Sequence, residues 1–183
     1  MAREQNQLTH KTEKQESAKI VGLISDTHVP VRAKEIPQQV FKIFEKADYI
    51  IHAGDLVQMS VVEELEQLAL VLAVHGNMDG PEIRGRLPRI NSLKVFDWKI
   101  GVIHDCRALF GAGKMREIAA RNGFDVLVYG HTHSPAVKTE AKTLYVNPGS
   151  PTNPTPPFIN RPTVALLRVT TQSIMPEIMP IQK

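Results

Sequence analysis

The stretch IVGLISDTHVP, residues 20–30, decides the fold of this 183-residue chain. It joins a short apolar run rich in β-branched residues to a cluster of Asp, His and small residues. Such a run is typical of a buried strand, and we predict one over residues 19–25. A second stretch, VLVYGHTHSP at residues 126–135, has the same form. Two strands that both end in paired polar side chains raise the expectation that these ends share one site.

The first half of the chain alternates predicted strands and helices. Apolar residues at helical spacing predict helices over 36–47 and 60–69, and Ser60 is expected to cap the second. Buried strands are predicted over 48–54 and 70–76. The order β-α-β-α-β with short connections implies a parallel sheet covered by helices.

The second half of the chain contains more predicted strands than one open sheet could hold. It reads as a hairpin turning near Asp97, a helix that ends at Gly123, a strand over 124–130, a second hairpin over 136–150, and closing strands over 163–170 and 173–182. We therefore predict an α/β fold with two packed mixed β-sheets flanked by helices, a four-layer αββα sandwich. Residues 1–18 are expected to form a flexible polar tail and residues 19–183 a single domain.

Composition predicts a cytoplasmic globular protein. The chain is 42% hydrophobic and 22% charged, and its mild net charge of +3 is by itself no evidence of nucleic-acid binding. No stretch approaches the roughly 18 apolar residues that a membrane helix needs. Cys106 is the only cysteine, so an intramolecular disulfide is impossible and a reducing compartment is expected.

Oxygen and imidazole donors recur where the predicted strands end. They are Asp26, His28, Asp55, Asn77, His104, His131 and His133. Ligands of parallel α/β sheets bind outside the carboxyl ends of the strands. These donor types suit Mn, Fe, Zn or Ni, and seven of them exceed what one tetrahedral ion can use. Two ions that share one carboxylate are therefore expected.

Local geometry supports that expectation in two ways. Alternation along an extended segment is expected to place both donors of each Asp-x-His or His-x-His pair on one side. The glycines of AGD, HGN and YGH are expected to let the backbone turn sharply beside an ion.

The ordered series of motifs resembles that of the calcineurin-like metallophosphoesterases. Here it reads SDTH, AGD, GNMD, VIHD and YGHTH, within residues 25–133. The compact length and the NPGS at residues 147–150 resemble the small YfcE-type phosphodiesterases of bacteria and archaea, whose fold the retromer subunit Vps29 shares. The resemblance covers about residues 19–180.

The resemblance implies a role for each donor. Asp26, His28 and His133 would hold a first ion, Asn77, His104 and His131 a second, and Asp55 would bridge them. It implies a metallophosphoesterase fold and a phosphodiesterase in which a hydroxide between two divalent ions attacks phosphorus in line. Asp55, Asn77 and His104 are then the predicted catalytic residues. Mn²⁺ is the first candidate, with Ni²⁺, Zn²⁺ and Fe open.

Two departures from the family pattern bear on the substrate. Met78 stands where larger relatives often carry a His placed to protonate the leaving group or to steady the substrate, so aryl diesters are expected to be better substrates than alkyl ones. Asp105 and Cys106 stand where close relatives have Gly and His. Asp105 and Arg107 are the candidates for substrate binding.

Other interpretations stay open. A Vps29-like interaction scaffold with little turnover, or a phosphomonoesterase, is the alternative to a phosphodiesterase that acts on a small substrate. Nothing points to a nucleic-acid-binding segment, and exposed hairpin strands would permit a homo-oligomer. A basic set near two of the motifs is expected to form a solvated face, with phosphate recognition as the alternative: Arg84, Arg86, Arg89 and Arg107. Asp79 is expected to cap a turn rather than to hydrogen-bond a donor. His52 and His75 precede donors on their strands, and no specific role is expected of them, with support of those donors as the alternative.

Overall fold

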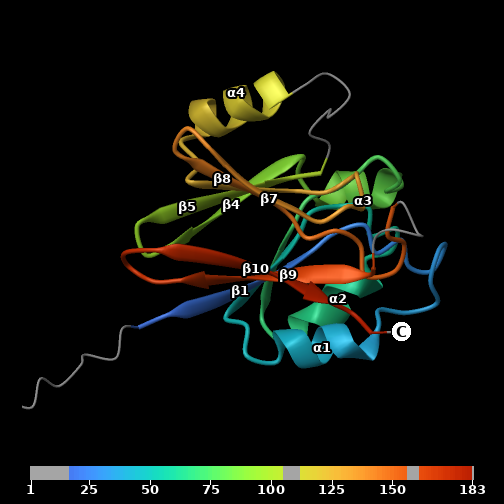
Figure 1. Cartoon of the computed structure of the whole chain (residues 1–183). Coiled ribbons are helices and arrows are strands. Elements are labelled where there is room, and N and C mark those ends of the chain that lie inside the picture. Colours follow the sequence, from blue (N-terminus) through green and yellow to red (C-terminus); the bar gives the residue numbers. More distant parts are fainter. Residues whose placement is uncertain (1–16, 105–111, 156–160, 183) are drawn as a thin grey trace, which may run out of the picture.

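The computed structural model describes residues 17–104, 112–155 and 161–182, and these form four layers. Helices α1 and α2 cover one five-stranded sheet, a second five-stranded sheet packs against the first, and helix α4 covers the second (Figure 1). The predicted αββα architecture is therefore confirmed. None of the helices in the described ranges is both long and apolar enough to span a membrane.

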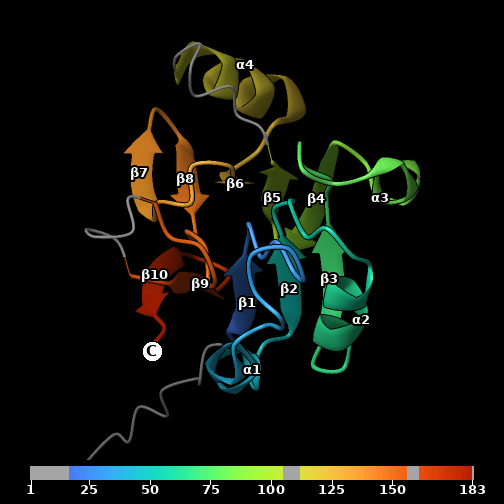
Figure 2. The same cartoon turned by 90° about the vertical axis from the view of Figure 1, so that its right-hand side faces the viewer.

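The first sheet has the order β10-β9-β1-β2-β3. Its strands are β1 (Lys19–Ile24), β2 (Tyr49–His52), β3 (Leu70–Ala73), β9 (Thr163–Val169) and β10 (Ile174–Pro180). Strands β1, β2 and β3 are parallel, as the sequence predicts, and Figure 2 shows them side by side. Strands β9 and β10 add antiparallel pairs at the other edge. Helices α1 (Gln38–Phe44) and α2 (Ser60–Glu66) connect the parallel strands.

The second sheet has the order β4-β5-β6-β8-β7. Its strands are β4 (Ile90–Val95), β5 (Trp98–Ile103), β6 (Val126–Tyr129), β7 (Ala136–Glu140) and β8 (Thr143–Asn147). Strands β5, β6 and β8 are parallel, and the predicted hairpins β4–β5 and β7–β8 form its two edges. Helix α4 (Ala112–Asn122) ends before Gly123, whose φ of 63° is the left-handed conformation expected after a helix.

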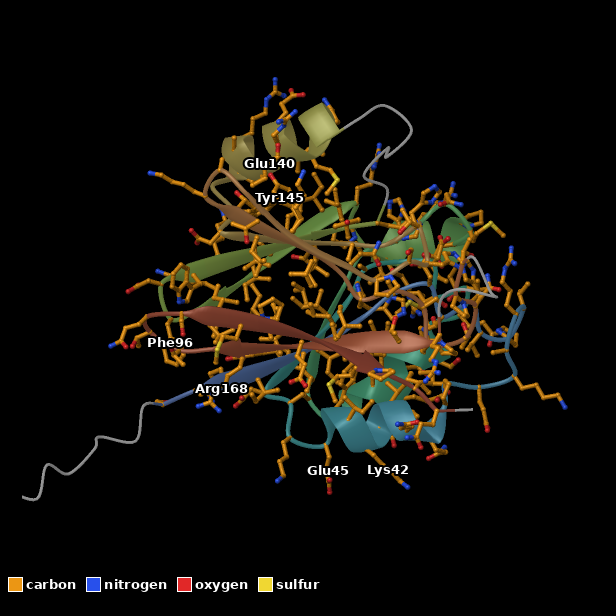
Figure 3. The ribbon with its side chains drawn as sticks, in the orientation of Figure 1. Lys42, Glu45, Phe96, Glu140, Tyr145 and Arg168 are labelled. Atoms are coloured by element: carbon orange, nitrogen blue, oxygen red, sulfur yellow. The ribbon has the colours of Figure 1, made fainter. Side chains whose placement is uncertain are left out.

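The core follows the alternation of side chains along the strands. Val21 and Leu23 of β1 lie in the cluster between the two sheets, whereas Ile24 faces α1 and α2. Tyr145 of β8 is buried under α4, as Figure 3 shows. Gly22 points outward against α1, and a Cβ there would lie only 2.9 Å from the Phe44 ring. Burial on both faces explains why the central strands read as continuous apolar runs.

Two local features differ from the sequence prediction. Helix α3 (Pro81–Arg86) was not predicted, although Gly80 at its N-cap and Pro81 at its first position are ordinary start signals. Ser60 does not cap α2. Met59 is the N-cap and already has helical dihedral angles, so Ser60 lies inside the helix and no side chain caps it.

Candidate metal centre

All seven predicted donors lie at the carboxyl ends of strands from both sheets. Asp26 and His28 follow β1, Asp55 follows β2, Asn77 follows β3, His104 follows β5, and His131 and His133 follow β6. Backbone hydrogen bonds hold these loops together. The Asp26 N–H donates to Gly54 O at 3.0 Å, and the Gly130 N–H donates to His104 O at 3.3 Å. The structure thus gathers donors that are up to 107 positions apart in the sequence.

The first cluster consists of Asp26, His28 and His133. The Nε2 atoms of the two histidines lie 3.2 Å apart, and Asp26 Oδ1 lies 3.3 Å from His133 Nε2 and 3.9 Å from His28 Nε2. Ligand atoms that each lie about 2.0–2.2 Å from one tetrahedral ion are about 3.3–3.6 Å apart. Two of the three separations lie close to this range and the third is longer, so these side chains could share a divalent ion after a small approach of Asp26 and His28.

The second cluster consists of Asn77, His104 and His131. Asn77 Oδ1 lies 3.0 Å from His104 Nε2 and 2.8 Å from His131 Nδ1. One amide oxygen and two imidazole nitrogens converge here. This donor set suits a borderline divalent metal rather than a thiolate-preferring one.

Asp55 lies between the two clusters. Its Oδ2 atom is 3.8 Å from His28 Nε2 in the first cluster and 3.3 Å from His104 Nε2 in the second. Its Oδ1 atom accepts a hydrogen bond of 2.7 Å from the Met78 N–H. One carboxylate oxygen therefore faces both clusters while the backbone holds the other.

Backbone carbonyls orient two of the histidine rings. His104 Nδ1 lies 2.8 Å from Ala53 O, and His133 Nδ1 lies 2.6 Å from Asn153 O and 3.0 Å from the Asn153 side-chain amide nitrogen. These contacts leave the Nε2 atom of each ring directed toward the clusters, where a neutral imidazole would offer its lone pair to an ion. Metal-binding histidines are commonly oriented in this way. His28 Nδ1 is buried and has no hydrogen-bond partner in the described residues.

Burial and nearby charges shift the pKa values of His28 and His104 in opposite directions. Burial lowers the pKa of His28 below its ordinary value and outweighs the opposing charges of Asp55 and Asp26. Burial alone would also lower the pKa of His104, but the hydrogen bond to Asp55 and the two Asp charges outweigh it and raise that pKa. Burial alone would raise the pKa of Asp55, yet the His104 and Met78 hydrogen bonds lower it. A shared negative charge thus draws cations to the centre.

The backbone of the centre is left-handed at most of its donors. Five donors, with φ between 47° and 71°, are Asp26, His28, Asp55, His131 and His133. The expectation that the paired donors sit on extended segments is therefore wrong. Each pair comes together through two left-handed residues instead. Such conformations are costly for non-glycine residues and typically cluster at functional sites.

The glycines of the three motifs mainly leave space for neighbouring carboxylates, rather than allowing the sharp turns that were expected. Of the three motif glycines, only Gly54 has a positive φ, of 89°. A Cβ at Gly76 would overlap Asp55 Oδ1, and a Cβ at Gly130 would overlap Ser25 Oγ and lie 2.9 Å from Asp26 Oδ2. The absence of a side chain at these positions lets the carboxylates reach the clusters.

Several supporting residues were missed or underrated in the sequence. Ser150 Oγ donates to Asp26 O at 2.8 Å, and Thr152 Oγ1 donates to Thr27 O at 2.8 Å. The NPGS motif at residues 147–150 drew attention to Ser150 but not to Thr152. His52 is fully buried and bridges Thr27 Oγ1 and the Gly54 N–H, each at 3.1 Å.

Asp79 does more than stabilise a turn. It is 2% exposed, and it accepts hydrogen bonds from the backbone of its own turn and of the neighbouring β2 loop. Met78 is 47% exposed at the centre. Asp105, Cys106 and Arg107 lie outside the described residues, so the substrate-binding candidates stay predictions.

Comparisons with known proteins identify the family of this chain. Residues 20–172 match the family described as "Calcineurin-like phosphoesterase superfamily domain". A Methanothermobacter thermautotrophicus protein named "Probable metallophosphoesterase" is 38% identical over 87% of this chain and 91% of its own length. A Methanocaldococcus jannaschii phosphodiesterase is 34% identical over 70% and 82%. The structure of Vacuolar Protein Sorting 29 from Cryptosporidium parvum matches with a TM-score of 0.74 and 24% identity, covering 91% of this chain and 99% of that one.

Proposed function

This chain belongs to the calcineurin-like phosphoesterase superfamily, and on that premise we propose that it is a phosphodiesterase that uses two divalent metal ions. The observation that carries the proposal is the position of Asp55 Oδ2, which faces histidines of both clusters. A relative named as a phosphodiesterase supports the reaction class.

The two clusters take the roles of two ligand sets. Asp26, His28 and His133 hold the first ion, Asn77, His104 and His131 the second, and Asp55 belongs to both. When bound, two such ions supply an activated water and neutralise charge on the phosphoryl oxygens. Mn²⁺ is our first choice, with Ni²⁺, Zn²⁺ and Fe as alternatives for these donor types.

The protein contributes a centre whose donors are oriented in advance. The Nδ1 atoms of His104 and His133 lie against the carbonyls of Ala53 and Asn153, which orients both rings with Nε2 toward the clusters. The buried carboxylates of Asp26 and Asp55 provide the negative charge. Such preorganisation lowers the barrier because little rearrangement is needed during the reaction.

The leaving group receives no imidazole from residue 78. Met78 places a thioether there, which cannot donate a proton, so the leaving group has to depart as a weak base. Aryl diesters should therefore react faster than alkyl diesters, and diesters faster than monoesters.

The test is hydrolysis of bis-p-nitrophenyl phosphate and p-nitrophenyl phosphate by metal-stripped protein, with Mn²⁺, Ni²⁺, Zn²⁺ or Mg²⁺ restored singly. We expect metal-dependent cleavage of the diester, lost in Asp55→Asn together with part of the bound metal. Asp97→Asn is the matched control because that side chain is fully exposed. Full activity in Asp55→Asn would refute the two-ion centre. Metal binding without cleavage of either ester would instead favour an interaction scaffold.

A further inference from the structure

A pocket of about 440 Å³ opens beside the second cluster. Asn77 and His104 form part of its lining, so the pocket is continuous with the proposed position of the second ion. Its volume lies within the range of about 300–1,000 Å³ that is usual for small-molecule sites. A group attached to a phosphoryl group at the ions could therefore extend into this pocket.

One wall of the pocket is apolar. It is formed by Ile90 of β4, Ile103 of β5 and Ile118 of α4. Ile103 is buried, whereas Ile90 is 42% exposed and presents its side chain to the opening. Three branched aliphatic side chains of this kind would favour contact with a planar or apolar group of a ligand.

Two arginines also line the pocket. Arg84 of α3 and Arg89, which precedes β4, both line the pocket. Arg84 donates one hydrogen bond, of 2.7 Å from Nη2 to Asn77 O. In the described residues neither guanidinium has a carboxylate within ion-pair distance, although Arg86 on the same helix pairs with Glu82 at 3.4 Å. Two guanidinium groups thus remain available to an anion.

We infer that this pocket binds a second phosphate of the substrate, so that the substrate class is a phosphodiester that carries a further phosphate beside a planar or apolar group. The inference rests on the proposed function, which places the reacting phosphoryl group at the ions. A diester carries a single negative charge, and two divalent ions already neutralise it. Two additional guanidinium groups complement another anion, to which each can donate paired hydrogen bonds.

Equilibrium binding tests the inference without relying on turnover. The probes are thymidine 3′-monophosphate and thymidine 3′,5′-bisphosphate, which differ by one phosphate, and binding to the Mn²⁺-loaded full chain is measured by isothermal titration calorimetry. We expect the bisphosphate to bind about tenfold more tightly, the size typical of one or more charge-assisted hydrogen bonds. Arg84→Gln and Arg89→Gln should each reduce this preference to about threefold or less.

Arg168→Gln is the matched control. Arg168 is an exposed arginine of β9 that lies at the end of the molecule away from α3 (Figure 3). This variant removes the same formal charge, so it should keep the wild-type preference unless the preference is a general charge effect. Because all three arginines are exposed, loss of folding is not expected to obscure the comparison.

Three results would overturn the inference. They are equal affinity for the two nucleotides, no binding of either nucleotide, and a preference for the bisphosphate that survives both pocket substitutions. Hydrolysis of bis-p-nitrophenyl phosphate combined with any of these results would leave the proposed function intact and remove only the second-phosphate site. The reverse result, a preference that depends on Arg84 and Arg89 without hydrolysis of any diester, would keep the binding site and reject the enzyme.

Discussion

The backbone N–H of Asp55 donates a 3.0 Å hydrogen bond to Asp79 Oδ2. The same oxygen accepts a 2.6 Å bond from the Gly76 N–H, and Oδ1 accepts a 2.7 Å bond from the Val57 N–H. One buried carboxylate therefore fastens the loop after β2 to the turn after β3. These are the two segments that carry Asp55 and Asn77, so Asp79 fixes their separation without facing either cluster.

Asp79→Asn should weaken both the fold and the metal centre. An amide has one acceptor oxygen, and its NH₂ group would face a backbone N–H, a mismatch that costs about 1–3 kcal/mol when buried. We expect the free energy of unfolding, measured by urea denaturation, to fall by about that amount. Metal affinity, measured by calorimetry, should fall as well. The exposed control Asp97→Asn should change stability by less than about 0.5 kcal/mol. Wild-type values for Asp79→Asn would contradict this positioning role.

Gly130→Ala should disturb the first cluster selectively. The new methyl group would overlap Ser25 Oγ and approach Asp26 Oδ2, so the Asp26 carboxylate has to move. We expect fewer bound ions per chain by elemental analysis, with the circular dichroism spectrum retained. Gly80→Ala is the control, because a Cβ at Gly80 meets no atom within 4 Å. Unchanged metal content in Gly130→Ala would show that the position of Asp26 is not critical.

His52 should make the fold sensitive to acid. Burial lowers its pKa from 6.5 to about 4, so the unfolded chain takes up a proton in this interval and the folded chain does not. The free energy of unfolding therefore falls as pH drops from about 6.5 to 4, and His52 contributes about 2 kcal/mol of the loss between pH 7 and pH 4.5. Above this interval the residue is neutral in both states and adds no pH dependence.

His52→Asn tests that contribution, since its amide oxygen can replace Nδ1 as acceptor for the Gly54 N–H. Urea denaturation at several pH values should give a slope of stability against pH that is shallower than in the wild type. The control is His75→Asn, because His75 is partly exposed and lies two residues beyond the end of β3. An unchanged slope in His52→Asn would show that other groups dominate the acid response.

Met78→His should change the preference among leaving groups. The Met78 N–H is held by Asp55 Oδ1, so a new imidazole would be anchored beside the shared carboxylate. We expect kcat/KM for thymidylyl-thymidine, which has an alkoxide leaving group, to rise by at least about tenfold relative to bis-p-nitrophenyl phosphate. Met78→Leu should leave this ratio near that of the wild type. Equal changes for both substrates would exclude a general-acid role at this position.

The sequence predicted the sheets well because their strands are continuous apolar runs bounded by polar clusters, and burial on both faces requires that pattern. Helix α3 was missed for the opposite reason. It has six residues, of which only Ile83 is buried, and Gly85 lowers its helix propensity. A helix this short is defined by its start signals and its surroundings rather than by periodicity.

The donors of the centre could be recognised because each one follows a predicted strand. Their supports could not, since those depend on contacts between distant parts of the chain. Ser150 and Asp26, for example, are 124 positions apart. The left-handed donors were also unexpected, because Asp and His have no general preference for that conformation comparable to that of glycine.

The segment 150–153 has a consequence for how the protein matures. It holds the loop of Asp26 through Ser150 and Thr152, and it holds His133 through Asn153. A nascent chain that stops before this segment lacks these hydrogen bonds and also lacks β9, which pairs with β1. Contacts over such sequence separations form late, because loop closure has to precede them. Acquisition of metal at the first cluster should therefore accompany the completion of the first sheet rather than precede it.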